Sequence, residues 1–406
     1  MAGPLDGIRV LEWAMWQAGP IAGSMLGDLG AEVIKIEHPV RGDDARGMTQ
    51  VASDSGALPG GRVTSFEHAN RNKRGITLDI RSKGGREILR KLVERSDVFF
   101  TNFRDSVVLR AQMDYETLLQ YNPRLIYGIV TGYGSRGPDS DKRSFDIAGQ
   151  GRSGMMFAMG DRDMVEPTQM QGAPLDQLGG TMLAYAILAA LVARERTGKA
   201  QKVESSILGS GIHLYSFNVN SGLWRGRPLA RHSRARSRNA MANYYRCADG
   251  KWLMLAEYQS DRFWHDLCQA IGIGELENHP HYATAVARAE NYAEVIQTLD
   301  RAFETKTRDE WLAIFKEKGA GYAYEIINEI QDLASDQQVL DNEYITEFDH
   351  PTMGRVKIVG SPVLFDEQPL EIRPAPQFGE HTEEVLLEVC GYDWEDIGRF
   401  KEEGAI

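Results

Sequence analysis

A chain of 406 residues is too long for one ordinary hydrophobic core, so we expect two domains, and its 42% apolar and 26% charged residues are typical of a folded globular protein. The formal net charge of −12 argues against nucleic acid or an anionic membrane as the main partner, and the longest apolar run (182–193) is shorter than the ~20 residues of a membrane-spanning helix. The three widely spaced cysteines form no disulfide or metal-binding pattern, and the N-terminus has no signal-peptide pattern, which together predict a cytoplasmic protein without a metal site.

The first third of the chain alternates short β-rich runs with helical patterns. One such helical pattern covers 85–95, with its apolar residues on one face. Strands separated by helices predict a parallel sheet covered by helices, which is an α/β fold. The expected strands cover residues 8–13, 30–37, 76–80, 97–101 and 125–131.

The character of the chain changes in its second half. A predicted helix over 175–194 has apolar residues on every face, which is typical of a helix buried on all sides. The arginine-rich stretch 225–238 indicates a linker, with the steering of an acidic co-substrate as the alternative. A hairpin over 244–258 with an Asp-Gly turn, followed by helical patterns over 261–318, predicts a smaller second domain. The last residues return to short strands and end in a charged helix.

Polar residues collect at one edge of the predicted sheet. In an open parallel sheet, ligands bind outside the carboxyl ends of the strands, and this rule brings together Gln17, His38 and the pair Asn102-Phe103. Arginine and lysine at such an edge suit a polyanionic ligand with a nucleotide end, although each of them taken singly is more often a solvated surface charge. The basic residues assigned to this edge are Lys73 within the segment 70–74, Arg104, Arg110 and Arg143.

A nicotinamide dinucleotide fits this edge less well. Gly19, Gly23 and Gly27 follow the first strand, but they are spaced by four residues, whereas the dinucleotide fingerprint requires GxGxxG. A tight turn with small residues that let a helix pack closely explains these glycines better.

Asp176 is the strongest candidate for chemistry. It stands at the start of the apolar helix, where a plain helix N-cap is the alternative interpretation. As a nucleophile it would be held ionised by the helix N-terminus and, with an ordinary pKa of about 3.9, it would need no general base at neutral pH. Attack on an acyl-CoA carbonyl would leave a mixed anhydride, which keeps the acyl group activated. The backbone amides near Gly179 and Gly180 are a hypothesis for oxyanion stabilisation.

Motifs along the whole chain resemble those of the class III CoA-transferase family, and they occur in the family's order. The ordered run is far more specific than any one of its pieces. The motifs are PLDGIRVLE at 4–12, QAGP at 17–20, GAEVIKIE at 30–37, GD…R at 42–46, NRNKR at 70–74, TLDI at 77–80, SDVFFTNF at 96–103, NPRLIYGIVTGYGSRGP at 122–138, ILAAL at 187–191, TGKAQKV at 197–203, CADGKW at 247–252 and GEHTEEVL at 379–386.

The resemblance implies roles for individual residues. Asp176 would be the catalytic aspartate that forms an anhydride and then an aspartyl-CoA thioester, with Gln17 beside the reacting acyl group. Asp146 matches a second carboxylate near the nucleophile in some relatives. The positions that match the family's CoA site are His38, Lys73, Asn102, Phe103, Arg110 and Arg143.

The resemblance also implies a Rossmann-like large domain, with a parallel sheet built from both chain ends, and a smaller α+β domain. Members of this family form interlocked homodimers with active sites at the interface. The expected partners are an acyl-CoA and a small carboxylic acid, with the CoA thioester as substrate, no permanently bound cofactor, and neither nucleic acid nor membrane. We place the large domain at 1–210 and 335–406, a linker at 211–239, the small domain at 240–325 and a return linker at 326–334.

Two departures from the family's pattern bear on the reaction. Related acyl-CoA racemases carry a catalytic histidine where this chain has Phe145, and phenylalanine cannot transfer a proton. Formyl-CoA transferases carry a run of glycines over the site, which the stretch 236–245 lacks, so formyl-CoA specificity is not expected. We therefore predict CoA transfer, with a racemase or isomerase of the same superfamily as the second hypothesis and a non-catalytic CoA-binding protein as the third.

Overall fold

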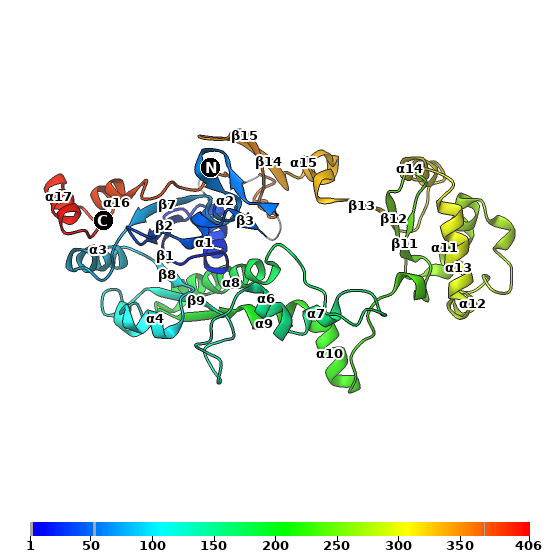
Figure 1. The fold of residues 1–406 in the computed structure, drawn as a ribbon, viewed down its shortest axis with the longest axis horizontal. Helices are drawn as coiled ribbons and strands as arrows, with labels where there is room; N and C mark the ends of the chain where they lie inside the picture. The colour runs from blue at the N-terminus through cyan, green and yellow to red at the C-terminus, as the bar shows by residue number, and fades with distance from the viewer. Residues whose placement is uncertain (1–2, 52–53, 369) are drawn as a thin grey trace. The chain divides into compact units, whose positions relative to one another are not determined.

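The protein consists of two compact units, described from a computed structural model of residues 3–51, 54–368 and 370–406 (Figure 1). The first unit contains the chain up to Met156, Gln169–Arg227 and Gln338–Ile406. The second unit contains Phe157–Thr168 and Pro228–Gln337. A large unit made from both ends of the chain therefore exists, and all candidate site residues lie in it.

A six-stranded, all-parallel sheet forms the centre of the first unit. Numbered along the chain, its strands lie in the order 3-2-1-4-5-6, which is the doubly wound order, and the order reverses between β1 and β8. Four of the predicted strands are confirmed, the one predicted at 76–80 begins three residues earlier as β7, and the sixth, β10, was not predicted. The strands are β1 (Arg9–Trp13), β2 (Glu32–Glu37), β7 (Lys73–Thr77), β8 (Val98–Thr101), β9 (Ile126–Thr131) and β10 (Lys202–Ser206).

Helices cover both faces of the sheet, because its central strands are apolar on both sides. On one face, α1 (Ala18–Asp28) and α8 (Pro174–Thr197) bury their side chains against β1, β8 and β9. On the other face, α3 (Lys83–Glu94) packs together with α16 (Thr382–Glu388) and α17 (Trp394–Glu402). Shorter helices follow individual strands: α2 (Thr64–Asn70), α4 (Asp105–Arg110), α5 (Tyr115–Leu119), α6 (Asp146–Arg152), α9 (Ile207–Leu214) and α10 (Ser216–Arg225).

The C-terminal part of the chain contributes helices to the large unit, and the expectation that it contributes strands to the parallel sheet is wrong. Among the described residues after Ser206, none belongs to that sheet. In the C-terminal segment of the large unit, β14 (Ile345–His350) and β15 (Gly354–Val359) pair with each other as a separate antiparallel hairpin. The apolar residues of α16 and α17 supply the packing that the sequence suggested.

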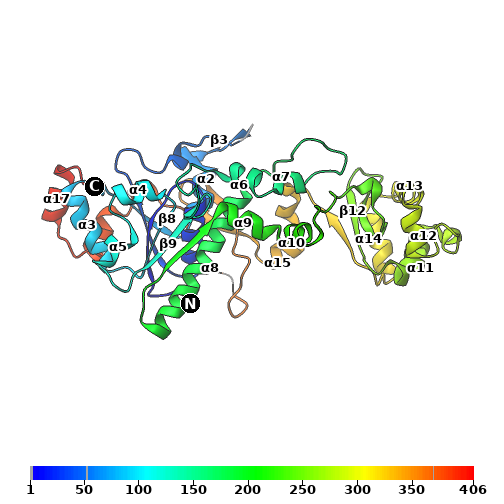
Figure 2. The same ribbon diagram turned by 90° about the horizontal axis from the view of Figure 1, so that it is seen from below.

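The helix α8 is buried along one side only. Its buried residues, such as Leu183 and Ile187, face α1 and the sheet, and Figure 2 shows it beside β9 and α9. Tyr185 and Val192 on the opposite side are 68% and 53% exposed. The expectation of burial on all sides is therefore wrong for the single chain. Of the helices in the described part of the chain, α8 alone has the length and apolar composition of a membrane span, and its packing against α1 and the sheet is that of a core helix.

The second unit has an antiparallel three-stranded sheet covered by helices. The predicted hairpin is confirmed by β11 (Ala242–Arg246) and β12 (Trp252–Ala256), and β13 (Tyr324–Ile327) pairs with β12. Tyr245 stacks on Phe303 in its core, with ring centroids 4.8 Å apart. The predicted helices are α11 (Ser260–Ile271), α12 (Ala285–Glu290), α13 (Tyr292–Phe303) and α14 (Arg308–Glu317).

Candidate active site

The candidate site forms where the strand order reverses, between β1 and β8. The loop after β1 carries Gln17, and the side chain of Asn102, just after β8, spans the gap to this loop. Its Oδ1 atom accepts from the Met15 backbone N–H at 3.1 Å, and its Nδ2 atom donates to the Met15 carbonyl at 2.7 Å. The rings of Trp16 and Phe145 meet edge to face at 5.9 Å, which brings the start of α6 to the same place. This crevice is where doubly wound sheets bind their ligands.

Asp176 is the third residue of α8 and does not cap it, so the N-cap interpretation is wrong. The cap position belongs to Ala173, whose backbone is left-handed at φ 54°. The capping acceptor comes from α6 instead. Asp146 Oδ1 accepts from the backbone N–H groups of Leu175, at 2.6 Å, and Asp176, at 3.1 Å. A buried carboxylate 30 residues earlier thus satisfies the helix end and leaves the Asp176 side chain free.

The carboxylate of Asp176 is half-buried, and no hydrogen-bond partner contacts it among the residues that the structure describes. Burial, with a smaller contribution from the nearby Asp146 carboxylate, raises the pKa of Asp176 to about 7. The expectation of a fully ionised carboxylate at neutral pH is therefore corrected: about half of the molecules carry the charge at pH 7. The expectation failed because it weighed the helix N-terminus and not the burial or the second carboxylate.

The helix α8, which carries Asp176, packs tightly on the start of α1, which Gln17 precedes. A Cβ atom at Gly180 would come within 2.5 Å of the Ala18 carbonyl oxygen, so only glycine permits this contact. Asp176 stands one turn before Gly180 on the same face of α8, which places it over the residue before Ala18. Gln17 is the N-cap of α1, but its side chain forms no capping hydrogen bond. Among the described residues no hydrogen bond engages its amide, which can therefore meet a ligand.

Gly179 and Gly180 do not supply an oxyanion site. Both lie in the second turn of α8, where backbone N–H groups donate to carbonyls four residues earlier. Gly179 packs beside Val130, and its carbonyl accepts from the Ser205 hydroxyl at 2.9 Å. Gly180 serves close packing on α1, and the oxyanion hypothesis for the two glycines is wrong.

Lys73 is buried and cannot reach a bound CoA, so its assignment to the CoA site is corrected. Its side chain is 0% exposed, and its Nζ atom lies 2.8 Å from Glu12 Oε2 and 2.8 Å from the Pro20 carbonyl oxygen. The physical reason lies in the direction of the strand. Lys73 begins β7, and the ligand-binding edge lies at the carboxyl ends, so residues before a strand belong to the opposite edge.

Arg81 takes the place at the edge that was assigned to Lys73. It follows the carboxyl end of β7, and one of its guanidinium nitrogens lies 3.3 Å from His38 Nε2. The pKa of His38 is lowered, first by burial and then by the charge of Arg41, with a smaller effect of Arg81. The charge of Asp79 opposes this shift. His38, Arg41 and Arg81 thus gather at the ends of β2 and β7, where Arg81 Nε also pairs with Asp79 at 3.3 Å. The sheet-edge rule, applied to the end of β7, would have found Arg81.

The other predicted CoA-site residues follow β8 and β9, on loops or on a short helix. Phe103 packs on Trp13 with ring centroids 4.3 Å apart. Arg110 ends α4, is exposed, and donates to the Ser106 carbonyl at 2.9 Å. Arg143 is exposed in the loop that leads to α6. The side chain of Asn102 is different, because both ends of its amide are engaged by Met15.

His68 is a site residue that sequence reasoning missed. It lies on α2, and its Nε2 atom is 3.2 Å from Oε1 of Gln177, the residue after Asp176. Burial lowers the pKa of His68, and the hydrogen bond with Gln177 opposes that shift. No motif marked this position, since a histidine on a short helix gives no signal of what it faces.

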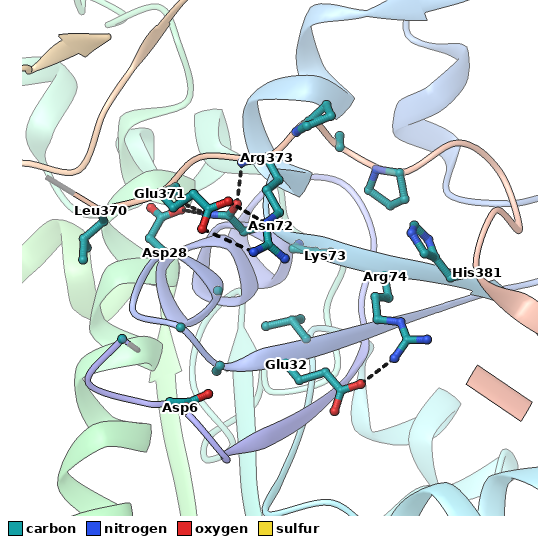
Figure 3. A pocket seen from close by; sticks show the side chains of 18 of the residues that line it. Asp6, Asp28, Glu32, Asn72, Lys73, Arg74, Leu370, Glu371, Arg373 and His381 are labelled. Atoms are coloured by element: carbon teal, nitrogen blue, oxygen red, sulfur yellow. Dashed lines mark hydrogen bonds and ion pairs between the residues drawn. The ribbon is translucent and has the colours of Figure 1, made fainter. Parts of the chain in front are cut away.

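A cavity of about 970 Å³ lies at the opposite edge of the sheet (Figure 3). It surrounds the amino ends of β2 and β7, where Glu32 pairs with Arg74 at 2.7 Å. Neither Gln17 nor Asp176 lines it. Within residues 3–51, 54–368 and 370–406, no group of three histidine, cysteine or acidic side chains could hold a metal ion.

Comparison with known proteins identifies the family. Residues 5–382 match the model of CoA-transferase family III. The chain is 31% identical to succinyl-CoA:glutarate CoA-transferase of Homo sapiens, over 99% of this chain and 90% of the relative. It is 34% identical to succinate–glutarate CoA-transferase of Agrobacterium fabrum, over 95% of this chain and 96% of the relative.

A solved structure supports the same assignment. The crystal structure of a CAIB/BAIF family protein from Brucella suis superimposes with a TM-score of 0.85 at 31% identity, covering 96% of this chain and all of that one. Sequence and fold agree over nearly the full length of the chain. The protein therefore belongs to CoA-transferase family III and is an enzyme of that family.

Proposed function

We propose that this enzyme transfers CoA from an acyl-CoA to a carboxylic acid through covalent intermediates on Asp176. One observation carries the proposal: a half-buried carboxylate, without a hydrogen-bond partner among the described residues, lies one turn before Gly180, where α8 packs on the residue that follows Gln17. The CoA-transferases among the relatives support the reaction type. The role of Asp176 rests on the geometry and on its match to the family's motif.

The proposed reaction exchanges acyl bonds without net proton transfer. An Asp176 oxygen attacks the thioester carbonyl and the C–S bond breaks. The CoA thiolate is released, and an acyl-aspartyl anhydride forms on Asp176. The thiolate then attacks the aspartyl carbonyl and releases the first acid, which leaves aspartyl-CoA. The acceptor carboxylate attacks aspartyl-CoA and expels the thiolate, which forms a second anhydride between the acceptor and Asp176. The thiolate finally attacks the acceptor's carbonyl in this anhydride, which gives the new acyl-CoA and frees Asp176. Each intermediate keeps the activation of the original thioester.

The raised pKa of Asp176 suits this role. A carboxylate that holds its proton more strongly is also a stronger nucleophile, and about half of the enzyme is in the ionised form at pH 7. We assign the Gln17 amide to hydrogen bonding with the acyl group, and Asp146 to holding the first turn of α8 in place.

The cluster of His38, Arg41 and Arg81 is proposed to bind CoA phosphates, with Arg81 exchanging its exposed ion pair with Asp79 for a phosphate. Arg41 and Arg81 are exposed, with the Arg81 side chain 67% accessible, so both can pair with phosphate. Phe103, Arg110 and Arg143 lie at the same edge and remain part of the proposed CoA site.

We propose a homodimer, interlocked as in the family that the sequence resembles. The outward side of α8 and the helices α9 and α10 expose a set of large apolar residues, which a soluble monomer rarely leaves in contact with water. The exposed apolar residues are Tyr185, Val192, Ile212, Leu214, Phe217, Leu223 and Trp224. Replacing Trp224 by Asp should shift the mass measured by light scattering from dimer to monomer.

The acids are proposed from the relatives. Because two of them are named for succinyl-CoA or succinate and for glutarate, short dicarboxylic acids are the first donors and acceptors to test. A racemase or isomerase remains the alternative, and Phe145 at the position of the racemase histidine weighs against it. Solvent-deuterium exchange at the substrate α-carbon, without a co-substrate acid, would support that alternative.

The test is intact-protein mass spectrometry after incubation with acyl-CoAs, including succinyl-CoA and glutaryl-CoA. We expect a CoA-sized adduct that hydroxylamine removes and that maps to the peptide with Asp176. Asp176→Asn, which keeps the shape of the side chain, should form no adduct and transfer no CoA. An Asn variant that retains turnover would exclude Asp176 as the nucleophile.

A further inference from the structure

The backbone of the loop after β1 is held by side chains from beneath it. Lys35 Nζ donates to the Ala14 carbonyl at 2.8 Å, and Asp43 Oδ1 accepts from the Trp16 N–H at 3.0 Å. Asn102 holds both the N–H and the carbonyl of Met15. Four consecutive polar groups of the backbone are therefore engaged by side chains that come from other parts of the fold.

The side chains that hold this loop are joined in a buried cluster of ion pairs. Lys35 Nζ lies 2.9 Å from Asp43 Oδ2 and 3.1 Å from Glu12 Oε1, and all three side chains are at most 1% exposed. Although burial alone would lower it, the carboxylates of Asp43 and Glu12 raise the pKa of Lys35 above its ordinary value. Lys35 is therefore charged throughout the physiological range, and its geometry is fixed by three oxygen atoms.

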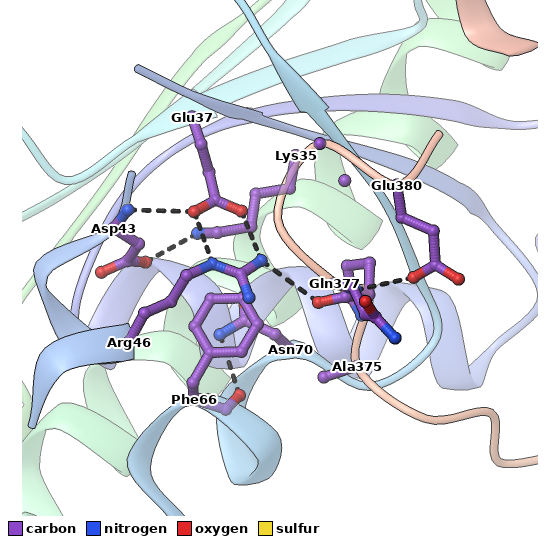
Figure 4. Close-up of polar contacts among 12 residues, drawn as sticks. Lys35, Glu37, Asp43, Arg46, Phe66, Asn70, Ala375, Gln377 and Glu380 are labelled. Carbon is purple, nitrogen blue, oxygen red and sulfur yellow. Dashed lines mark hydrogen bonds and ion pairs between the residues drawn. The ribbon is translucent and has the colours of Figure 1, made fainter. Parts of the chain in front are cut away.

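A second ion pair supports Asp43 from its other side (Figure 4). Glu37 accepts from the Asp43 backbone N–H at 2.9 Å and from two nitrogens of Arg46 at 2.7 and 2.8 Å. The Arg46 guanidinium lies 3.6 Å from the centre of the Phe66 ring. The position of Asp43 is thus determined by the ends of β2 and by α2, and it does not depend on the loop that Asp43 holds.

The loop needs such support because Trp16 has a left-handed backbone. Its φ is +65°, a region that non-glycine residues adopt only when their surroundings impose it. The Asp43 oxygen fixes the N–H of Trp16, and the Gln17 carbonyl accepts from Ile21 N–H at 2.8 Å in the first turn of α1. Gln17 therefore stands between two fixed points, with its side chain free.

We propose that Asp43 is a positioning residue, which holds Trp16 left-handed so that the Gln17 amide stays over Asp176. This inference rests on the proposed function of Gln17 and Asp176. Asp43 touches neither the substrate nor the reacting atoms in this role. Misplacing a reacting-centre contact by about 1 Å can cost ~100-fold in rate, so the effect should fall on the chemical step.

The first variants are Asp43→Ala, Asp43→Asn and Asn102→Ala. We expect Asp43→Ala to lower kcat by about 10- to 100-fold, with the KM for acyl-CoA changed less than about threefold. Asp43→Asn keeps an oxygen that can accept from Trp16 N–H and should restore much of kcat. If Asp43→Ala folds poorly, Asn102→Ala tests the same loop, because it leaves the ion-pair cluster intact.

Asp28→Asn is the matched control. Asp28 is also a buried carboxylate paired with a cation, Arg71, at 2.6 Å, but it lies at the far end of α1. The variant Asp28→Asn should lower the free energy of unfolding without lowering kcat. Hydrogen exchange measured by mass spectrometry should show faster exchange of peptide 14–20 in Asp43→Ala and Asn102→Ala, and unchanged exchange there in Asp28→Asn.

A double-mutant cycle with Gln17→Ala gives the decisive outcome. If Asp43 acts through Gln17, Asp43→Ala should cost little further kcat once Gln17 is alanine. Equal fold losses in the two backgrounds would overturn the proposal, and so would normal exchange of peptide 14–20. Failure of the proposed function is a separate result, because the wild-type enzyme would then form no hydroxylamine-sensitive adduct at Asp176.

Discussion

The Oδ1 atom of Asp146 lies 3.1 Å from the backbone nitrogen of Asp176, and it also accepts from the N–H before it. One carboxylate therefore closes the helix that carries the other, and the two are close enough for their charges to interact. The same contact that stabilises the first turn of α8 makes the ionisation of Asp176 harder. Stability and reactivity are coupled through this pair.

The rate of CoA transfer should depend on pH through Asp176. Because the attacking species is the carboxylate, kcat/KM should rise with pH and level off above an apparent pKa near 7. In Asp146→Asn the repulsion is absent, so the midpoint should move to lower pH, though burial keeps it above the ordinary aspartate value. Asparagine retains an oxygen for capping, so the melting temperature serves as the control. A midpoint that stays in place or moves up would contradict this account.

The free energy of unfolding should carry the same signature. The folded protein holds a proton on Asp176 up to about pH 7, whereas the unfolded chain releases it near pH 4, so ionisation of this group lowers stability as pH rises between these values. Asp176→Asn removes this dependence. In urea unfolding from pH 4.5 to 8, the free energy of unfolding of the variant should therefore increase relative to that of the wild type up to about pH 7. Above this pH the difference between the two should stay constant. A constant difference across this range would show that Asp176 has an ordinary pKa.

Two adjacent glycines should respond in opposite ways to alanine. Gly180→Ala places a Cβ atom 2.5 Å from the Ala18 carbonyl oxygen and should lower the free energy of unfolding by about 1–3 kcal/mol. At Gly179 the nearest atom, Val130 Cγ2, is 3.5 Å away, and alanine should be neutral or stabilising by up to about 1 kcal/mol. Thermal and urea unfolding measure both. Similar losses at the two positions would refute the close α1–α8 contact.

Lys73 and Arg81 should separate stability from CoA binding. Lys73→Met leaves Glu12 with one cation fewer in a buried site and should cost about 3 kcal/mol of stability. Arg81→Ala should leave stability within about 1 kcal/mol, since its contacts are exposed, but should weaken CoA binding by about tenfold. Calorimetric titration with CoA and urea unfolding give the two readouts. Unchanged CoA affinity in Arg81→Ala would remove this residue from the proposed phosphate site.

The sequence was sufficient to predict most of the sheet, because strand and helix periods are local. The runs 98–100 and 125–130 have no charged residue and are mostly apolar, as expected for strands buried on both faces. The strand β10 was missed because Lys202–Ser206 is polar and lies at the edge of the sheet. The C-terminal helices could not be assigned to their face of the sheet, since their partners on α3 and β7 lie some 300 residues earlier.

The placement of several candidate residues at one sheet edge could be predicted from the sequence, but their contacts could not. The sheet-edge rule gathered Gln17 and Asn102 correctly, because it depends only on where strands end. Lys73 was misplaced because a lysine in sequence looks the same whether it meets phosphate or a buried Glu12. The capping of α8 by Asp146 is a contact across 30 residues, and no local pattern encodes it.

The held loop after β1 also has a consequence for the evolution of new substrate ranges. The backbone of Met15 and Trp16 is hydrogen-bonded to Asn102 and Asp43. Substitutions at these two positions would therefore displace the adjacent Gln17 as well as change the space for the substrate acid. The segment that carries Phe145 is exposed and bears no such ties from buried charges. A library that seeks a different acid preference should therefore vary residues 144 and 145 and leave 14–20 and Arg143 untouched.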